Sequence, residues 1–212
     1  MRDNLERKRQ EKERGNDMPE NRKLKISFNS PVILSFTILC FAAMVLNIVT
    51  RGFTNQVFFS VYRSSLLSPL TYIRFFGHVL GHAGWSHLFG NITLILVVGP
   101  LLEEKYGSAN MLFVILATAF STGLAHYALF PRMGLLGASG VVFALILLSS
   151  FTSMKEGEIP LTFILVAVIY LGQQVYDGIF VKDNVSNLTH ILGGVMGAAL
   201  GYVMNKNKMN RY

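Results

Sequence analysis

The sequence predicts an all-α, polytopic membrane protein with six transmembrane helices and an interfacial first loop. Two features predict this class. Of the 212 residues, 51% are apolar and 15% are charged, whereas a typical soluble domain has about 45–50% apolar and roughly 25% charged residues. Beyond residue 31, long apolar runs alternate with short polar gaps. A run of about 20 apolar residues crosses the hydrocarbon core of a bilayer, so the lipid bilayer is the predicted surrounding of these runs.

The charged residues gather at the amino terminus. Nine of the 19 Lys and Arg residues and six of the 12 acidic residues lie within 1–25, almost without apolar neighbours. Such a composition is typical of a solvated, disordered tail, and it lacks the apolar core of a signal peptide. We therefore predict a disordered cytoplasmic tail over 1–28, a six-span membrane domain over 29–205 and a short cytoplasmic tail over 206–212. The basic excess lies in the tails rather than on a folded face, which excludes nucleic acid as a partner.

Six apolar runs define the predicted spans. The segment 51–84 is not among them, because it is too long for a simple loop and too polar for a span. Its aromatic side chains favour short helices at the membrane interface, where amphipathic rings are stabilised. The predicted spans cover 31–50, 85–102, 109–130, 134–151, 159–176 and 188–204.

Positive residues predict the orientation of the spans. With the amino terminus inside, the inner segments carry 14 Lys and Arg residues and the outer segments carry five. Since cytoplasmic loops are enriched in Lys and Arg, both termini are predicted to be cytoplasmic. The second, fourth and sixth spans then run from the outside to the inside. Their first turns are therefore expected at one depth, near the outer face.

Four polar residues occupy that depth, namely His87, Asn91, Ser139 and His190, with Ser139 about five residues into the fourth span. Polar groups within a membrane are costly unless they are paired or line a wet cavity, so they indicate a functional site. A serine hydroxyl needs an adjacent base to act as a nucleophile, and His190 can accept its proton. We predict a Ser139–His190 dyad, because neither of the two spans contains a carboxylate. The alternative for His190 is a hydrogen bond that simply ties two helices together.

Small residues favour close contact between the two spans that carry the dyad. Gly193, Gly197 and Gly201 form a stripe on the last span. Gly140 and Ala144 are four residues apart and share a face of the fourth span. Small residues at such spacings let helix backbones approach closely. Close approach is what a hydroxyl and an imidazole need to reach hydrogen-bond distance.

The second span supplies candidate donors to an oxyanion. His87 and Asn91 are four residues apart, so they face the same way, and both side chains can donate a hydrogen bond. The backbone N–H of Ser139, near the amino-terminal end of its span, adds a third donor. Together they can stabilise the negative charge of a tetrahedral intermediate.

These motifs resemble the rhomboid intramembrane serine proteases. The resemblance rests on Gly137-Ala138-Ser139-Gly140, on His190 with Gly193, and on His87-x-x-x-Asn91. It implies a six-helix core, a water-filled cavity open to the outer side, and catalysis by the dyad with neither a metal nor ATP nor any other cofactor. It also implies that His87, Asn91, the Ser139 amide and Gly137 form the oxyanion and substrate-binding set. Further matches are Arg74, His78, His82, Glu103 and Gly107.

The resemblance carries expectations about substrates and location. It implies single-span transmembrane protein substrates, whose helices must unwind near a small residue because helical carbonyls are shielded by their own hydrogen bonds. The loop over the site and the fifth span are implied to form the substrate gate. A compact six-span core is typical of bacterial and archaeal members, so the bacterial inner membrane is the expected location. Two residues depart from the family pattern: Phe143 replaces a common Tyr but can still pack against His190, and Ile73 replaces an aromatic before Arg74.

Three other functions fit parts of the sequence. His78, His82 and His87 could form a metal site, although no His-Glu-x-x-His motif accompanies them. An inactive, client-binding member of the rhomboid superfamily is the alternative to a protease, and the presence of both Ser139 and His190 favours activity. A transporter would need polar residues through the full depth of the membrane, whereas the polar residues here stop in the outer third.

Overall fold

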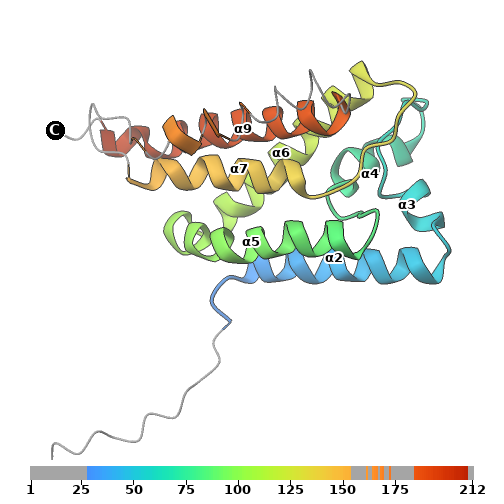
Figure 1. Cartoon of the computed structure of the whole chain (residues 1–212), viewed down its shortest axis with the longest axis horizontal. Helices are drawn as coiled ribbons and strands as arrows, with labels where there is room; N and C mark the ends of the chain where they lie inside the picture. The colour runs from blue at the N-terminus through green and yellow to red at the C-terminus, as the bar shows by residue number, and fades with distance from the viewer. Residues whose placement is uncertain are drawn as a thin grey trace, which may run out of the picture.

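A computed structural model describes residues 28–153, seven positions between 161 and 172, and residues 184–209. The described residues form helices and contain no strand, apart from one isolated bridge between Val61 and Leu135. The predicted all-α class is therefore confirmed (Figure 1). The helices are α2 (Pro31–Val49), α3 (Phe53–Val57), α4 (Pro69–Gly77), α5 (Trp85–Tyr106), α6 (Ser108–Leu129), α7 (Ser139–Ser150), the 3₁₀ helix η1 (Phe151–Ser153) and α9 (Asn184–Met209).

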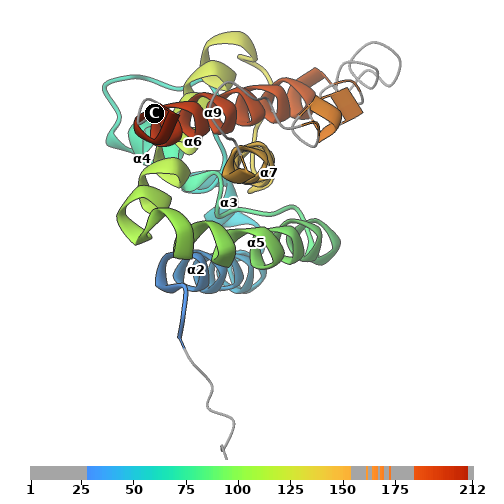
Figure 2. The same ribbon diagram turned by 90° about the vertical axis from the view of Figure 1, so that its left-hand side faces the viewer.

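The long helices lie side by side in a bundle, and the short helices α3 and α4 gather at one end of it (Figures 1 and 2). Three helices, α2, α5 and α6, are long and apolar enough to cross a membrane. Helices α5, α7 and α9 all begin at the end of the bundle that carries α3 and α4 (Figure 1). This arrangement agrees with the expectation that the first turns of these helices share one level.

The sequence located some span boundaries closely. Helices α2 and α6 match their predicted spans to within one residue at each end. Helix α5 continues four residues beyond the predicted end at 102, and α9 begins four residues before 188. The predicted span 159–176 lies mostly outside the described residues, so the count of six spans stays a prediction. Residues 1–27 and 210–212, which belong to the predicted tails, also lie outside the described residues.

The extension of α5 has a clear physical cause in Glu103. This carboxylate is 3% exposed, and its two oxygens accept hydrogen bonds from the backbone amides of Val32 and Ile33, both at 2.9 Å. The Ser108 hydroxyl donates a third hydrogen bond at 2.7 Å. An acidic group at a helix amino terminus satisfies donors that have no intrahelical partner and complements the helix dipole. By capping α2, the Glu103 carboxylate is satisfied while buried, so this charged residue can belong to helix α5 rather than to an exposed loop.

The predicted start of the fourth span at residue 134 was wrong, because α7 begins at Ser139. The preceding residues are extended: Leu135 and Val61 exchange two backbone hydrogen bonds at 2.9 Å, and the Gly137 amide donates to the His78 carbonyl at 2.9 Å. Hydropathy does not distinguish this apolar segment from a helix. Non-helical backbone is tolerated at membrane depth where the protein satisfies its polar groups. With 12 residues, α7 is about 18 Å long, which is shorter than the roughly 30 Å hydrocarbon core of a bilayer.

The first loop contains short helices, as the sequence predicted. Helix α4 carries Arg74, which is 6% exposed. Its Nε donates to the Val57 carbonyl at 2.8 Å, its Nη1 lies 3.4 Å from the Ser64 hydroxyl, and its guanidinium stacks over the Tyr62 ring at 4.3 Å. Arg74 thereby ties α4 to the segment that follows α3. The position of these helices at the membrane interface stays a prediction.

Candidate active site

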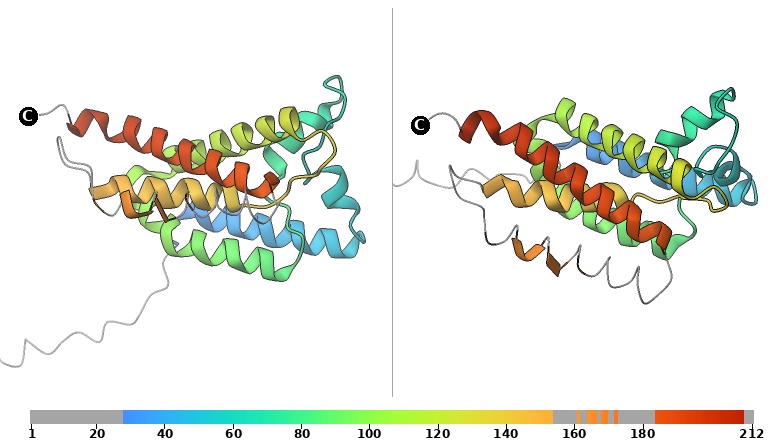
Figure 3. Two further views of the ribbon diagram at one scale, coloured as in Figure 1. Left: turned by 45° about the horizontal axis from the view of Figure 1, so that its top comes forward. Right: turned by 90° about the horizontal axis from the view of Figure 1, so that it is seen from above.

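The closest helix packing next to the candidate site joins α7 and α9. A Cβ atom built on Gly193 would lie 2.8 Å from the carbonyl carbon of Gly140, and one built on Gly197 would lie 2.6 Å from the Cα of Ala144. Neither position accepts a side chain, because the obstacle is backbone. The glycine stripe predicted on the last span therefore faces the small residues predicted on the fourth. Figure 3 shows α9 packed against α7 and crossing it obliquely.

This packing places His190 against the first turns of α7. The His190 ring stacks on the Phe143 ring with 4.5 Å between centroids and 11° between planes, so the predicted packing of Phe143 is confirmed. Ser139 is the first residue of α7 and is half-buried. Since Ser139 precedes Phe143 by four residues, the two side chains share a face of the helix. The stacking thus brings His190 to the face of α7 that carries Phe143, and helical spacing places Ser139 on that same face.

Gly137 brings the extended segment against α5. Its φ is +132°, a conformation that side chains with a Cβ rarely adopt. A Cβ built on it would lie 2.7 Å from Cε1 and 2.8 Å from Nε2 of His87, and 3.9 Å from Nδ2 of Asn91. The backbone angle thus favours glycine, and any side chain at this position would have to displace the His87 ring. The structure thus brings together three of the predicted site residues, namely His87, Asn91 and Gly137. Gly137 lies two positions before Ser139 in the chain.

Asn91 is held by a residue that the sequence analysis left outside the site. The Asn91 side chain is buried, and its Nδ2 lies 3.1 Å from Nε2 of His82. The His82 Nδ1 lies 3.1 Å from the Leu80 carbonyl, which can only accept a hydrogen bond. Burial lowers the pKa of His82 to about 4, so its neutral ring carries hydrogen on Nδ1 and accepts at Nε2. Asn91 therefore donates one N–H to His82 and keeps the second N–H.

Two further histidines support the segments around the site. The His78 Nδ1 lies 3.2 Å from the Arg74 carbonyl, and its Nε2 lies 3.3 Å from the Thr122 hydroxyl. Burial lowers the pKa of His78 to about 4. On α6, the His126 Nε2 donates to the Met133 carbonyl at 2.9 Å and so holds the connection between α6 and α7. His78 and His126 thus have packing and hydrogen-bonding roles.

The three histidines proposed as alternative metal ligands are arranged differently. The His82 and His87 rings meet edge to face with 5.0 Å between centroids, whereas His78 points to Thr122 on α6. Among the residues that the structure describes, no three His, Cys, Asp or Glu side chains gather in a way that could hold a metal ion. The arrangement instead places the side chains of His87 and Asn91 beside Gly137.

Comparison with known proteins gives consistent matches. Residues 69–207 match the family model of the Rhomboid domain. The chain is 34% identical over 143 residues to Rhomboid-related protein 1 of Caenorhabditis elegans, covering 63% of this chain and 40% of that protein. It is 33% identical over 160 residues to Rhomboid-related protein 2 of Mus musculus, covering 66% and 53%. It is 26% identical over 180 residues to Rhomboid protease GluP of Bacillus subtilis, covering 80% and 34%. The alignments thus span about half or less of these three relatives.

Proposed function

This chain belongs to the rhomboid family of membrane proteins, and we propose that it is an intramembrane serine endopeptidase that cuts single-span transmembrane proteins. Ser139 is the proposed nucleophile and His190 is the proposed base. His87, Asn91 and the Ser139 amide are the proposed donors to the oxyanion. Relatives such as GluP are named proteases, whereas others are named only rhomboid-related, so the activity of this chain needs its own test.

The stacking of His190 on Phe143 is the observation that supports the dyad best. It fixes the plane of the imidazole beside the helix face that begins with Ser139. The ring lies on α9, where Gly193 allows backbone contact with Gly140. A base must be oriented by a neighbour before it can accept a proton efficiently. In this proposal an aromatic ring and a tight helix contact contribute to that orientation.

The proposed reaction is an acyl transfer in two halves. In the first half, Ser139 Oγ attacks the scissile carbonyl carbon while His190 accepts the hydroxyl proton, and His190 then returns that proton to the leaving amine. The products of this half are a free amine and an ester on Ser139. In the second half, water attacks the ester, again with His190 as the base, and releases the carboxylate and the free hydroxyl.

The tetrahedral intermediates carry a negative oxygen that needs donors in place beforehand. The second N–H of Asn91 can fill that role, because His82 occupies the first. The His87 ring lies against Gly137, next to the segment that leads to Ser139. The Ser139 amide begins α7 and has no intrahelical acceptor, and the helix dipole favours a negative charge there. Each such donor is worth about 10²–10³ in kcat.

The test is cleavage of a model single-span substrate by the purified protein in detergent. Ser139→Ala and His190→Ala are compared with the wild type and with Ser150→Ala, which alters a buried serine of the same helix whose hydroxyl bonds back to the Ile146 carbonyl. We expect cleavage by the wild type and by Ser150→Ala, no cleavage by the two site variants, and no effect of a chelator. Full activity of either site variant would refute the dyad. Substrate binding without cleavage by the wild type would favour the client-binding alternative.

The proposal includes a location and an orientation. We place the protein in a bacterial inner membrane with both termini in the cytoplasm, as the distribution of Lys and Arg favours. The site would then lie near the outer face. Labelling single cysteines with a membrane-impermeant thiol reagent tests this directly. In a Cys40→Ala background, the Arg132→Cys variant should react in intact cells and the Glu104→Cys variant should not.

A further inference from the structure

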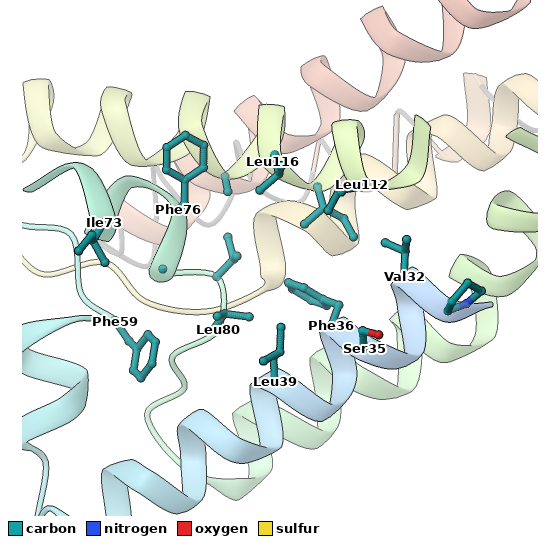
Figure 4. Close-up of a pocket in the computed structure, with 15 residues that line it drawn as sticks. Val32, Ser35, Phe36, Leu39, Phe59, Ile73, Phe76, Leu80, Leu112 and Leu116 are labelled. Atoms are coloured by element: carbon teal, nitrogen blue, oxygen red, sulfur yellow. The ribbon is translucent and has the colours of Figure 1, made fainter. Parts of the chain in front are cut away.

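An apolar groove lies between α2, α4 and α6 (Figure 4), and neither Ser139 nor His190 is among the residues that line it. Its volume is about 710 Å³, and of its 15 lining residues Ser35 alone has a polar side chain. We call this the α2–α6 groove. Side chains that line it include Val32, Phe36 and Leu39 of α2, Phe76 of α4, and Leu112 and Leu116 of α6.

The groove is continuous with surface that faces the bilayer. Its long walls are α2 and α6, both of which are long and apolar enough to cross a membrane. Leu39, Leu112 and Leu116 at its edges are 52%, 47% and 42% exposed within the protein. Because the chain is an integral membrane protein, hydrocarbon rather than water borders these side chains.

We propose that the acyl chain of a membrane phospholipid occupies the α2–α6 groove as a bound ligand. The groove follows α2 from Val32 to Leu39 (Figure 4), about 10 Å along the helix axis, so it matches an extended chain that runs parallel to the helices. An unfilled groove forfeits the dispersion contacts of its lining atoms.

The bound chain would pack behind the segment that supports the proposed site. Leu80 lines the groove with its side chain, while its carbonyl accepts the hydrogen bond that sets the tautomer of His82. Next to it, the carbonyl of His78 accepts from the Gly137 amide. A lipid chain against Leu80 therefore restrains the backbone that holds Asn91 and Gly137. The lipid site itself does not depend on proteolysis.

Quenching of tryptophan fluorescence by a brominated phosphatidylcholine tests the proposal. The sole tryptophan is first removed by Trp85→Phe. Phe76→Trp then reports on the groove, with Leu112→Trp as a second groove reporter. The matched control is Phe113→Trp on α6, which is 55% exposed and does not line the groove. In mixed micelles, we expect the groove reporters to be half-quenched at a brominated-lipid fraction about tenfold lower than the control, equivalent to about 1.4 kcal/mol.

A filling variant shows whether the groove causes that difference. Ser35→Phe places a ring in the groove, whereas Ile38→Phe adds one to a position on α2 that is 62% exposed and does not line it. Ser35→Phe should bring the groove reporters to the control curve, and Ile38→Phe should leave the tenfold difference intact. Identical curves for both kinds of reporter, or a difference that survives Ser35→Phe, would overturn the proposal. Quenching that only a model transmembrane peptide reverses would assign the groove to a substrate helix instead.

Discussion

Replacing Gly137 by Ala should damage the candidate site from within. The new methyl group would lie 2.7 Å from Cε1 and 2.8 Å from Nε2 of His87, and the backbone would keep a φ of +132° that alanine disfavours. Non-glycine residues in such strained regions cost about 1–3 kcal/mol. Overpacking of a close contact costs about 1–3 kcal/mol more. The free energy of unfolding should therefore fall by roughly 2–6 kcal/mol if the backbone and His87 both stay in place.

The chain can lower that cost by moving the His87 ring, and the cost then appears as lost activity. Removal of one oxyanion donor lowers kcat by about 10²–10³. Two assays separate the outcomes: unfolding by SDS in mixed micelles gives the stability, and cleavage of a model substrate gives kcat. We expect Gly137→Ala to lower the free energy of unfolding by roughly 2–6 kcal/mol, to lower kcat by about 10²–10³, or to do both.

Gly134→Ala is the matched control for Gly137→Ala. Gly134 lies in the same connection, and a Cβ built on it meets no atom within 4 Å. This variant should retain wild-type stability and activity. If Gly137→Ala also stays within about 0.5 kcal/mol of the wild type, the range of ordinary surface substitutions, and cleaves at the wild-type rate, the packing of Gly137 against His87 is refuted.

Three other predictions concern the fold. Glu103→Ala should lower the free energy of unfolding by about 1–3 kcal/mol, because it leaves the buried Ile33 amide and the partly buried Val32 amide without acceptors. SDS unfolding checks this against exposed Glu104→Ala. Gly197→Val should cost at least about 1–3 kcal/mol through contact with the backbone of α7, whereas exposed Ala199→Val should cost less than about 0.5 kcal/mol. Burial lowers the pKa of His78 from 6.5 to about 4, so between these pH values the unfolded chain binds a proton that the folded chain does not. As the pH is lowered from 6.5 to 4, the free energy of unfolding should therefore fall by about 3 kcal/mol. His78→Gln should remove that part of the pH dependence.

The sequence predicts the long helices well because hydropathy is a strong signal there. Helices α2 and α6 lie between clear polar breaks and were located to within one residue. The end of α5 was missed because Glu103 and its charged neighbours read as a loop, whereas α2 supplies amides that bury the carboxylate. Such a partner 70 residues away is not visible in a local pattern.

The candidate site was predictable where it depends on helical spacing. The shared face of His87 and Asn91 and the glycine stripe of α9 both follow from the helix period. In the structure, His87 and Asn91 both lie near Gly137, and the glycine stripe packs against α7. The contact of His82 with Asn91 was missed, because His82 lies in an irregular segment where spacing gives no direction. The start of α7 was misplaced for a similar reason: Leu135 pairs with Val61 across a distant loop. The signal for a bend was present in Gly137 itself.

Covalent capture tests the central claim most directly. A fluorophosphonate reacts with a serine oxygen that an adjacent base activates: the P–F bond breaks, fluoride leaves, and the reaction stops at the phosphonylated serine. The wild type should gain one adduct, which peptide mass spectrometry should assign to Ser139, and His190→Ala should suppress that adduct while Ser150→Ala should not. An adduct on another serine, or equal labelling of Ser139 in His190→Ala, would contradict activation of Ser139 by His190.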